Sequence, residues 1–213
     1  MPYILLPGKP FPDPSLADEE GLLAIGGDLS PERLLLAYRK GIFPWYSEND
    51  PICWWSPDPR FVLFPSELKV SNSMRNVLNR GTFRFTIDRA FGEVILRCKE
   101  SLRYGEPGSW INDEIISAYT QLHGMGYAHS VESWQDGKLV GGLYGIRMGN
   151  FFFGESMFST VSNASKFAFI NYVKQLQKEG VILIDCQVYT THLESLGARM
   201  IERKEFLKML ETI

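Results

Sequence analysis

The sequence predicts an α+β fold with a mixed, largely antiparallel sheet flanked by helices. Three successive strand-like segments between residues 129 and 158 are separated by tight-turn signals, which predicts an antiparallel meander. Segments with helical spacing precede and follow this meander. The prolines Pro57 and Pro59 divide these regular elements from a start rich in turn formers and aromatics. We therefore predict a small N-terminal domain, residues 1–58, and a larger domain, residues 59–213.

One helix is predicted in the N-terminal domain, over residues 31–40. Ser30 is a typical N-cap, Pro31 suits the first helical position, and Gly41 ends the helix. Little else in this domain shows a regular pattern.

The larger domain begins with alternating helix and strand signals. Asn112 is a typical N-cap, and Asp113 and Glu114 in the first turn suit the positive end of the helix dipole. The predicted elements up to the meander are helices over 71–81 and 88–102, a short strand over 83–87 between them, and a helix over 113–126.

The meander carries the strongest β signal in the chain. Asp136-Gly137 is favoured in two-residue type I′ turns, and a second turn is predicted at Gly149-Asn150. The predicted strands are 129–135, 138–148 and 151–158. A helix over 163–178, a buried strand over 181–188, a short helix over 191–197, a strand over 198–202 and a terminal helix follow.

The composition predicts a soluble intracellular protein. The chain has 213 residues, of which 45% are hydrophobic, enough for a sizeable core. It has no apolar run long enough to span a bilayer, and its start lacks the features of a signal peptide. Its three cysteines form no CxxC pair, and His123, His129 and His192 lack metal-ligand spacing. We expect neither a disulfide framework nor a metal.

Positive charge is concentrated in one segment of this acidic protein. The net charge is −3, yet the segment from Lys69 to Arg103 has eight basic and three acidic residues. Such a segment could bind a phosphate backbone. Charge alone favours the more ordinary interpretation, a solvated helix face.

Polar residues interrupt two apolar strands and are the candidates for chemistry. Glu155 lies in "GESMFS", and Asp185 and Gln187 lie in "LIDCQV". Because strand side chains alternate, Asp185 and Gln187 should share a face, with Cys186 opposite as a packing residue. If the two strands are neighbours, Glu155 faces the same cleft. Neither motif contains a matching Lys or Arg, so these carboxylates favour a function, although a structural role for Asp185 stays open.

Several tryptophans occur in loops rather than in periodic elements. Trp45, Trp54, Trp55 and Trp110 lie in Pro- and Gly-rich segments. Indoles in such loops commonly fill a domain interface. They also suit stacking on an unpaired base, a contact worth about 1–3 kcal/mol.

A series of motifs occurs in order along nearly the whole chain: "GLLAIGGDLSPERLLLAYRKGIFPWY", "WWSPDPR", "SWIND", "LVGGLYG", "GESMFS", "NASK", "LIDCQV" and "HLESLGA". In these motifs the chain resembles the leucyl/phenylalanyl-tRNA-protein transferase family. The resemblance implies an acyltransferase domain like that of the GCN5-related N-acetyltransferases (GNAT-like). It also implies a cytoplasmic enzyme without a cofactor. Such an enzyme moves Leu or Phe, and less readily Met, from aminoacyl-tRNA to proteins that start with Arg or Lys, marking them for proteolysis.

The resemblance also implies roles for individual residues. Asp185 would orient the attacking α-amine and accept its proton, unless the leaving 3′-hydroxyl relays it. Gln187 would form a hydrogen bond with Asp185 or with the reacting ester. Glu155 would recognise the cationic N-terminal residue of the acceptor or orient the donor. The remaining implied contacts are a donor side-chain pocket of Met157, Leu143 and Tyr172, adenosine contacts of Trp45, Trp110 and Tyr38, and tRNA phosphate contacts of Arg75 and Arg80.

Three other functions remain open at this point. An enzyme of the same fold could use acyl-CoA, although the basic Gly-rich loop that holds its pyrophosphate is not evident in the sequence. A related transferase could pass aminoacyl groups to cell-wall precursors. A tRNA-binding protein without catalysis is a third alternative, which the acidic residues beside an apolar pocket disfavour.

Overall fold

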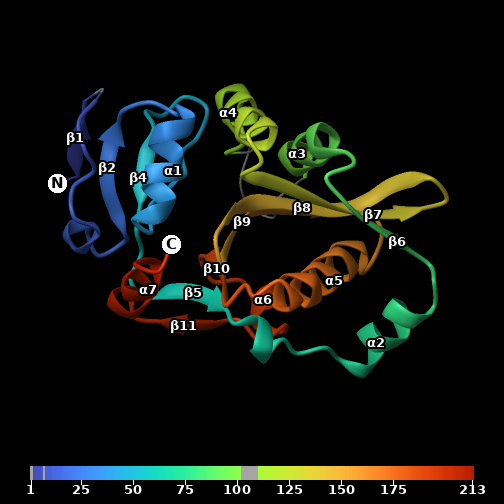
Figure 1. Cartoon of the computed structure of the whole chain (residues 1–213). Coiled ribbons are helices and arrows are strands. Elements are labelled where there is room, and N and C mark those ends of the chain that lie inside the picture. The colour runs from blue at the N-terminus through green and yellow to red at the C-terminus, as the bar shows by residue number, and fades with distance from the viewer. Residues whose placement is uncertain (1, 7, 102–109) are drawn as a thin grey trace.

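The computed structural model describes residues 2–6, 8–101 and 110–213, and its described elements form two sheets with helices packed against them (Figure 1). The predicted α+β class is confirmed. Among the described residues no helix is both long and apolar enough to cross a membrane.

The first 55 residues contain a four-stranded sheet that the sequence analysis did not predict. Its strands are arranged β1-β2-β4-β3. They have two to five residues each, too short for alternation to be recognised. The elements are β1 (Tyr3–Leu5), the 3-10 helix η1 (Pro14–Leu16), β2 (Leu22–Gly26), α1 (Pro31–Arg39), β3 (Phe43–Pro44) and β4 (Cys53–Trp55).

The second sheet has seven strands in the order β11-β5-β10-β9-β8-β7-β6. Among the described strands of this sheet only β10 and β9 pair in parallel, and the other neighbouring strands pair antiparallel. The strands are β5 (Arg60–Leu63), β6 (Arg84–Ile87), β7 (Ala128–Gln135), β8 (Lys138–Met148), β9 (Phe151–Ser159), β10 (Leu183–Gln187) and β11 (Arg199–Ile201).

The meander β7-β8-β9 is confirmed. At its first turn Asp136 and Gly137 both have positive φ angles, 50° and 75°, as a type I′ turn requires.

Helices cover both faces of the meander. Figure 1 shows α3 and α4 above it and α5 below it. The cap predicted at Asn112 is confirmed, since its side chain accepts a hydrogen bond from the Ile115 amide. The helical elements after β5 are η2 (Pro65–Glu67), α2 (Asn72–Asn79), α3 (Phe91–Glu100), α4 (Asp113–Gly124), α5 (Ala164–Lys178), α6 (Thr191–Glu194) and α7 (Arg203–Leu210).

The hydrophobic core continues from the small sheet into the large one. One cluster joins Leu34 and Tyr38 of α1 to Ile115 and Tyr119 of α4 and to Phe206 of α7. A second cluster lies between α5 and the other face of the large sheet. The small sheet is therefore packed against the α4 side of the large one.

Candidate active site

A cavity of about 510 Å³ opens where β9 and β10 separate. The two strands pair from Leu183 opposite Phe151 to Asp185 opposite Phe153, and the pairing then stops. Residues 154–159 of β9 and 184–188 at the end of β10 line the cavity, together with Trp45 and Trp110. The predicted adjacency of the two motifs is confirmed. The cavity's volume lies within the range of small-molecule sites.

A β-bulge carries Glu155. Across the β8-β9 ladder Tyr144 lies opposite Ser156 and Gly145 opposite Gly154, so Glu155 has no partner in the ladder. Such an extra residue interrupts the ladder and redirects a side chain. The bulge explains how a carboxylate can leave an apolar strand and reach the cavity.

Three side chains form hydrogen bonds with the Glu155 carboxyl group. Tyr38 donates to Oε1 over 2.7 Å, Gln187 Nε2 donates to the same oxygen over 3.0 Å, and Tyr119 contacts Oε2 over 3.1 Å. Burial raises the pKa of Glu155 to about 7; the hydrogen bonds from Tyr38 and Tyr119 oppose this rise, and the charge of Asp185 adds to it. The group therefore titrates near neutrality.

Asp185 is locked in a buried ion pair. Its Oδ1 accepts from Arg60 Nε over 2.8 Å, and its Oδ2 accepts from Arg60 Nη2 over 2.6 Å. The Gln187 backbone amide also donates to Oδ1, over 2.9 Å. The side chains of Arg60 and Asp185 are 1% and 0% exposed. Both carboxylate oxygens are therefore occupied within the protein.

Aromatic rings enclose the Arg60 guanidinium group. It lies 4.7 Å from the ring centroid of Phe43 in β3 and 4.8 Å from that of Phe206 in α7. Sequence analysis missed Arg60, because the partner of Asp185 is 125 positions away. The available signal was an arginine at the start of the apolar segment "RFVLF".

A second bulge changes the predicted arrangement of β10. Asp185 lies opposite Val62 and Gln187 opposite Phe61, which leaves Cys186 as the extra residue, and Gln187 has a φ of 63°. The predicted alternation is therefore wrong here: the Asp185 side chain reaches Arg60, whereas that of Gln187 reaches Glu155. Cys186 also borders the cavity. Burial raises the pKa of its thiol, which disfavours a nucleophilic role.

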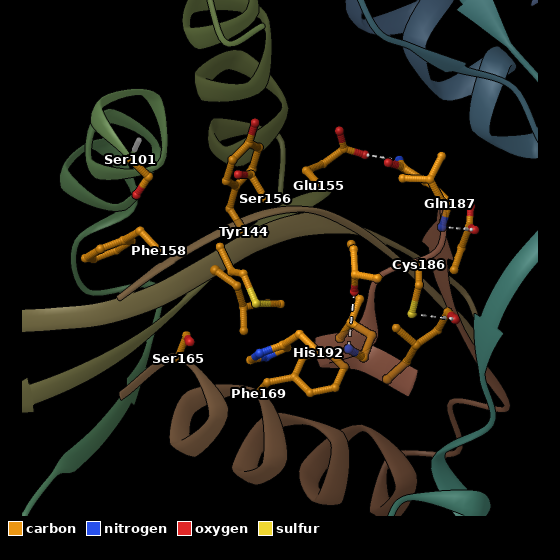
Figure 2. Close-up of a pocket in the computed structure, with 18 of the residues that line it drawn as sticks. Ser101, Tyr144, Glu155, Ser156, Phe158, Ser165, Phe169, Cys186, Gln187 and His192 are labelled. Carbon is orange, nitrogen blue, oxygen red and sulfur yellow. Dashed lines mark hydrogen bonds between the residues drawn. The ribbon is translucent and has the colours of Figure 1, made fainter. Parts of the chain in front are cut away.

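The opposite side of the cavity is mainly apolar. Figure 2 shows Glu155 and Gln187 facing each other on one side, with Phe169 and His192 on the other. Met157 and Leu143 line the cavity as expected, and Phe169 joins them. Tyr172 is only 4% exposed and packs against Phe152, outside the lining.

The expected adenosine contacts divide into two groups. Trp45 and Trp110 border the cavity. Tyr38 is fully buried, and its hydroxyl bonds Glu155 and Tyr119. Its lack of exposed surface does not fit direct contact with a nucleoside, so we correct its expected role to support of Glu155.

The expected phosphate contacts lie away from the cavity lining. Arg75 belongs to α2, Arg80 is its C-cap, and both are exposed. Farther along the basic segment Arg97 pairs with Glu93 and Glu100. Arg103 lies outside the described residues. No cluster of three or more potential metal ligands occurs within the described residues.

The site is thus a cavity between diverging strands, with a carboxyl and an amide on one side and apolar side chains on the other. Two family models match the chain: leucyl/phenylalanyl-tRNA protein transferase over residues 62–211, and the N-terminal domain of the same transferase over residues 27–58. The chain belongs to this family.

Curated relatives agree with this assignment. A leucyl/phenylalanyl-tRNA–protein transferase of Flavobacterium johnsoniae is 58% identical over 210 residues, which cover 99% of both chains. One from Syntrophobacter fumaroxidans is also 58% identical, over 94% of this chain and 86% of the relative.

The fold is shared by a solved structure of low sequence identity. FemX aligns with a TM-score of 0.53 and 10% identity over 84% of this chain and 70% of its own. A GCN5-related N-acetyltransferase from Kribbella flavida aligns with a TM-score of 0.41 and 10% identity over 78% of this chain and 59% of its own.

Proposed function

We propose that this protein transfers leucyl or phenylalanyl groups, and less readily methionyl groups, from aminoacyl-tRNA to the α-amino group of proteins that start with Arg or Lys. The transfer would occur in the cytoplasm and mark the acceptors for proteolysis. Membership of the transferase family carries this proposal. The cavity supports it, because its apolar side suits a donor side chain and its polar side suits an amine.

The donor side chain would enter the apolar side of the cavity. Met157 and Leu143 line it, and Phe169 replaces Tyr172 in our assignment because Tyr172 lies outside the lining. Methionine is unbranched and adapts to different neighbours, so one pocket can accept a branched and an aromatic guest. Leu and Phe would be selected by shape and apolar character.

The chemical step would be aminolysis of an activated ester. The acceptor nitrogen attacks the ester carbonyl carbon, the bond from that carbon to the tRNA 3′-oxygen breaks, and the leaving hydroxyl takes up the proton that the amine loses. Holding amine and carbonyl together supplies much of the acceleration in such a reaction. We assign this role to the polar side of the cavity.

Gln187 is our candidate for contact with the reacting groups. Its Nε2 is bonded to Glu155, so its carbonyl oxygen is left to accept from the incoming amine. Asp185 is assigned to positioning rather than to proton abstraction, because Arg60 and the Gln187 amide already occupy its oxygens. This assignment leaves proton transfer to the leaving 3′-hydroxyl.

The tRNA would be held at two places. Trp45 and Trp110 border the cavity and would stack on the terminal adenosine. Arg75 and Arg80 on the exposed surface of α2 would contact phosphates.

An acceptor assay tests the function directly. The protein is mixed with radiolabelled Leu-tRNA or Phe-tRNA and a model protein that starts with Arg, with the same protein starting with Gly as a matched control. Label on the Arg protein alone is expected. Label on neither protein, combined with binding of CoA or label on a cell-wall precursor, would contradict the proposal in favour of the corresponding alternative.

A further inference from the structure

Three side chains on three different elements contact one another in a closed ring behind the cavity. Tyr38 of α1 contacts Glu155 Oε1, Tyr119 of α4 contacts Glu155 Oε2, and the two phenol hydroxyls contact each other. Three oxygen-oxygen contacts need three protons, one for each hydrogen bond. A phenol has a single hydroxyl proton, so the two tyrosines supply only two.

An ionised Glu155 leaves one of these contacts without a proton. If both tyrosines donate to the carboxylate, the contact between their own oxygens has no hydrogen and is repulsive. If one tyrosine donates to the other, its own contact with a carboxylate oxygen has no hydrogen. The tyrosines are not the ionised members, because burial raises the pKa of Tyr38 and of Tyr119 well above the ordinary value.

We propose that Glu155 is a neutral carboxylic acid in the working enzyme, held by Tyr38 and Tyr119 in a closed ring of three hydrogen bonds. Oε2 donates to Tyr119, Tyr119 donates to Tyr38, and Tyr38 donates to Oε1. Each oxygen of the ring then donates or accepts in turn, and every contact has one proton.

The ring fixes the orientation of the Gln187 amide. Because Oε1 accepts from Tyr38, it carries no proton, and Gln187 has to present its Nε2 hydrogens to it. The carbonyl oxygen of Gln187 consequently points away from Glu155. Tyr38 and Tyr119 are therefore positioning residues, which act on the cavity through Glu155.

A neutral Glu155 suits the proposed aminolysis, on which this inference rests. A carboxylate near the acceptor amine would stabilise its ammonium form, which has no free electron pair for attack. A neutral acid lacks this effect, and it places no negative charge beside the oxyanion that forms on the ester. Groups other than Glu155 must accordingly recognise the cationic side chain of the acceptor.

The charged and titratable groups around the ring are few among the described residues. Asp185 raises the pKa of Glu155 by its charge, and its own charge is compensated by Arg60 of β5. On β8, Tyr144 packs edge-on against Tyr119. Gln187 contributes a neutral amide.

Infrared spectroscopy of the protein alone tests the proton on Glu155. At pH 6 the difference spectrum between the wild type and Glu155→Gln should contain a carboxylic acid carbonyl band, which disappears as the pH rises through about 7. A difference spectrum with carboxylate bands only at pH 6 would overturn the proposal. Because no substrate is present, this outcome is independent of whether the protein is a transferase.

A second variant tests the ring itself. Tyr119→Phe removes one ring hydroxyl with little change in shape, and we expect the acid band of Glu155 to shift in frequency while the circular dichroism of the fold is retained. An unshifted band would show that the proton does not lie in the ring. If Glu155→Gln fails to fold, the wild type and Tyr119→Phe can still be compared, because labelling with 13C-glutamate identifies the glutamate carboxyl bands.

The pH profile tests the link to activity. We compare the ratio of kcat/KM of the wild type to kcat/KM of Glu155→Gln at different pH values. For a single ionisation near pH 7, this ratio should fall about tenfold between pH 6 and pH 8. A ratio that stays constant over this range would separate Glu155 from the reaction.

Discussion

We propose that Asp185, a carboxylate that resembles a catalytic base, is instead part of the framework of the site. Arg60 binds both of its oxygens, and Phe43 and Phe206 exclude water from the guanidinium group. The Asp185 carboxylate also accepts the Gln187 amide and so supports the positive φ of that residue. Besides the effect of its charge on Glu155, Asp185 acts on the cavity through Gln187.

Asp185→Asn should therefore unfold more easily as well as lose activity. The change leaves a buried guanidinium group without its counter-charge, which costs about 3–5 kcal/mol. Urea unfolding of Asp185→Asn, Arg60→Met and the double variant measures this. We expect the double variant to lose less free energy of unfolding than the sum of the single losses. Unchanged stability of Asp185→Asn with abolished transfer would instead assign Asp185 to the chemistry.

Glu155 should make stability depend on pH in the opposite direction from an ordinary paired acid. Its folded pKa, about 7, lies above the ordinary value of 4.5. The folded state therefore binds more protons between these values, and its stability falls as the pH rises from 4.5 to 7. The contribution is fully present below pH 4.5.

The difference between the wild type and Glu155→Gln isolates this dependence, because glutamine does not titrate. We expect the free energy of unfolding of the wild type, relative to the variant, to fall by up to roughly 3 kcal/mol between pH 4.5 and pH 7. Denaturant unfolding at several pH values measures it. Parallel curves for the two proteins would contradict the raised pKa.

At the scale of elements, the two bulges convert paired strands into a site. The β9 bulge requires a close approach of β8, since a Cβ at Gly145 would lie 2.3 Å from the Phe153 carbonyl oxygen. Such an approach is far inside van der Waals distance, and backbone has to move to relieve it. Glycine at position 145 is thus a condition for the position of Glu155.

Gly145→Ala should accordingly destabilise the fold by about 1–3 kcal/mol and reduce transfer activity. Gly92→Ala is a matched control, because nothing lies within 4 Å of its added Cβ and Gly92 lies in the first turn of a helix, α3. Thermal unfolding of the two variants tests the difference. A Gly145→Ala protein as stable and active as the control would show that β8 tolerates the displacement.

The sequence did not predict β5, but it predicted the order of the later elements of the larger domain well, because turn signals and helical periods are local. It predicted neither bulge, since a bulge depends on the register between strands and not on one strand's own pattern. The misassigned alternation around Cys186 follows from this. Likewise, the neighbours of Glu155 come from α1 and α4, far away in sequence, so Tyr119 was not identified.

For the whole molecule, tRNA binding should depend on salt through α2. Replacing Arg75 and Arg80 with Gln should raise KM for aminoacyl-tRNA. The slope of log KM against log salt concentration should also decrease, by about 0.7–0.9 for each phosphate group that the variant no longer binds. The rate at saturating tRNA should be retained. The control is a double variant on α7, Lys204→Gln with Lys208→Gln, which removes the same amount of positive charge. Equal slopes in both double variants would exclude a specific role for α2.

The continuous core also bears on the predicted division at residues 58 and 59. Leu34 and Tyr38 pack in the same cluster as Ile115 of α4 and Phe206 of α7. We propose that the two parts unfold together, although they were predicted as separate domains from the sequence.

The aromatic enclosure of Arg60 has a consequence for synthesis on the ribosome. Phe43 is made early, whereas Phe206 belongs to α7, the last helix of the described fold. Until α7 leaves the ribosome, one side of the ion pair beneath the cavity stays open to water. A chain that terminates before α7 would therefore lack the Phe206 side of this enclosure, even if the meander had already formed.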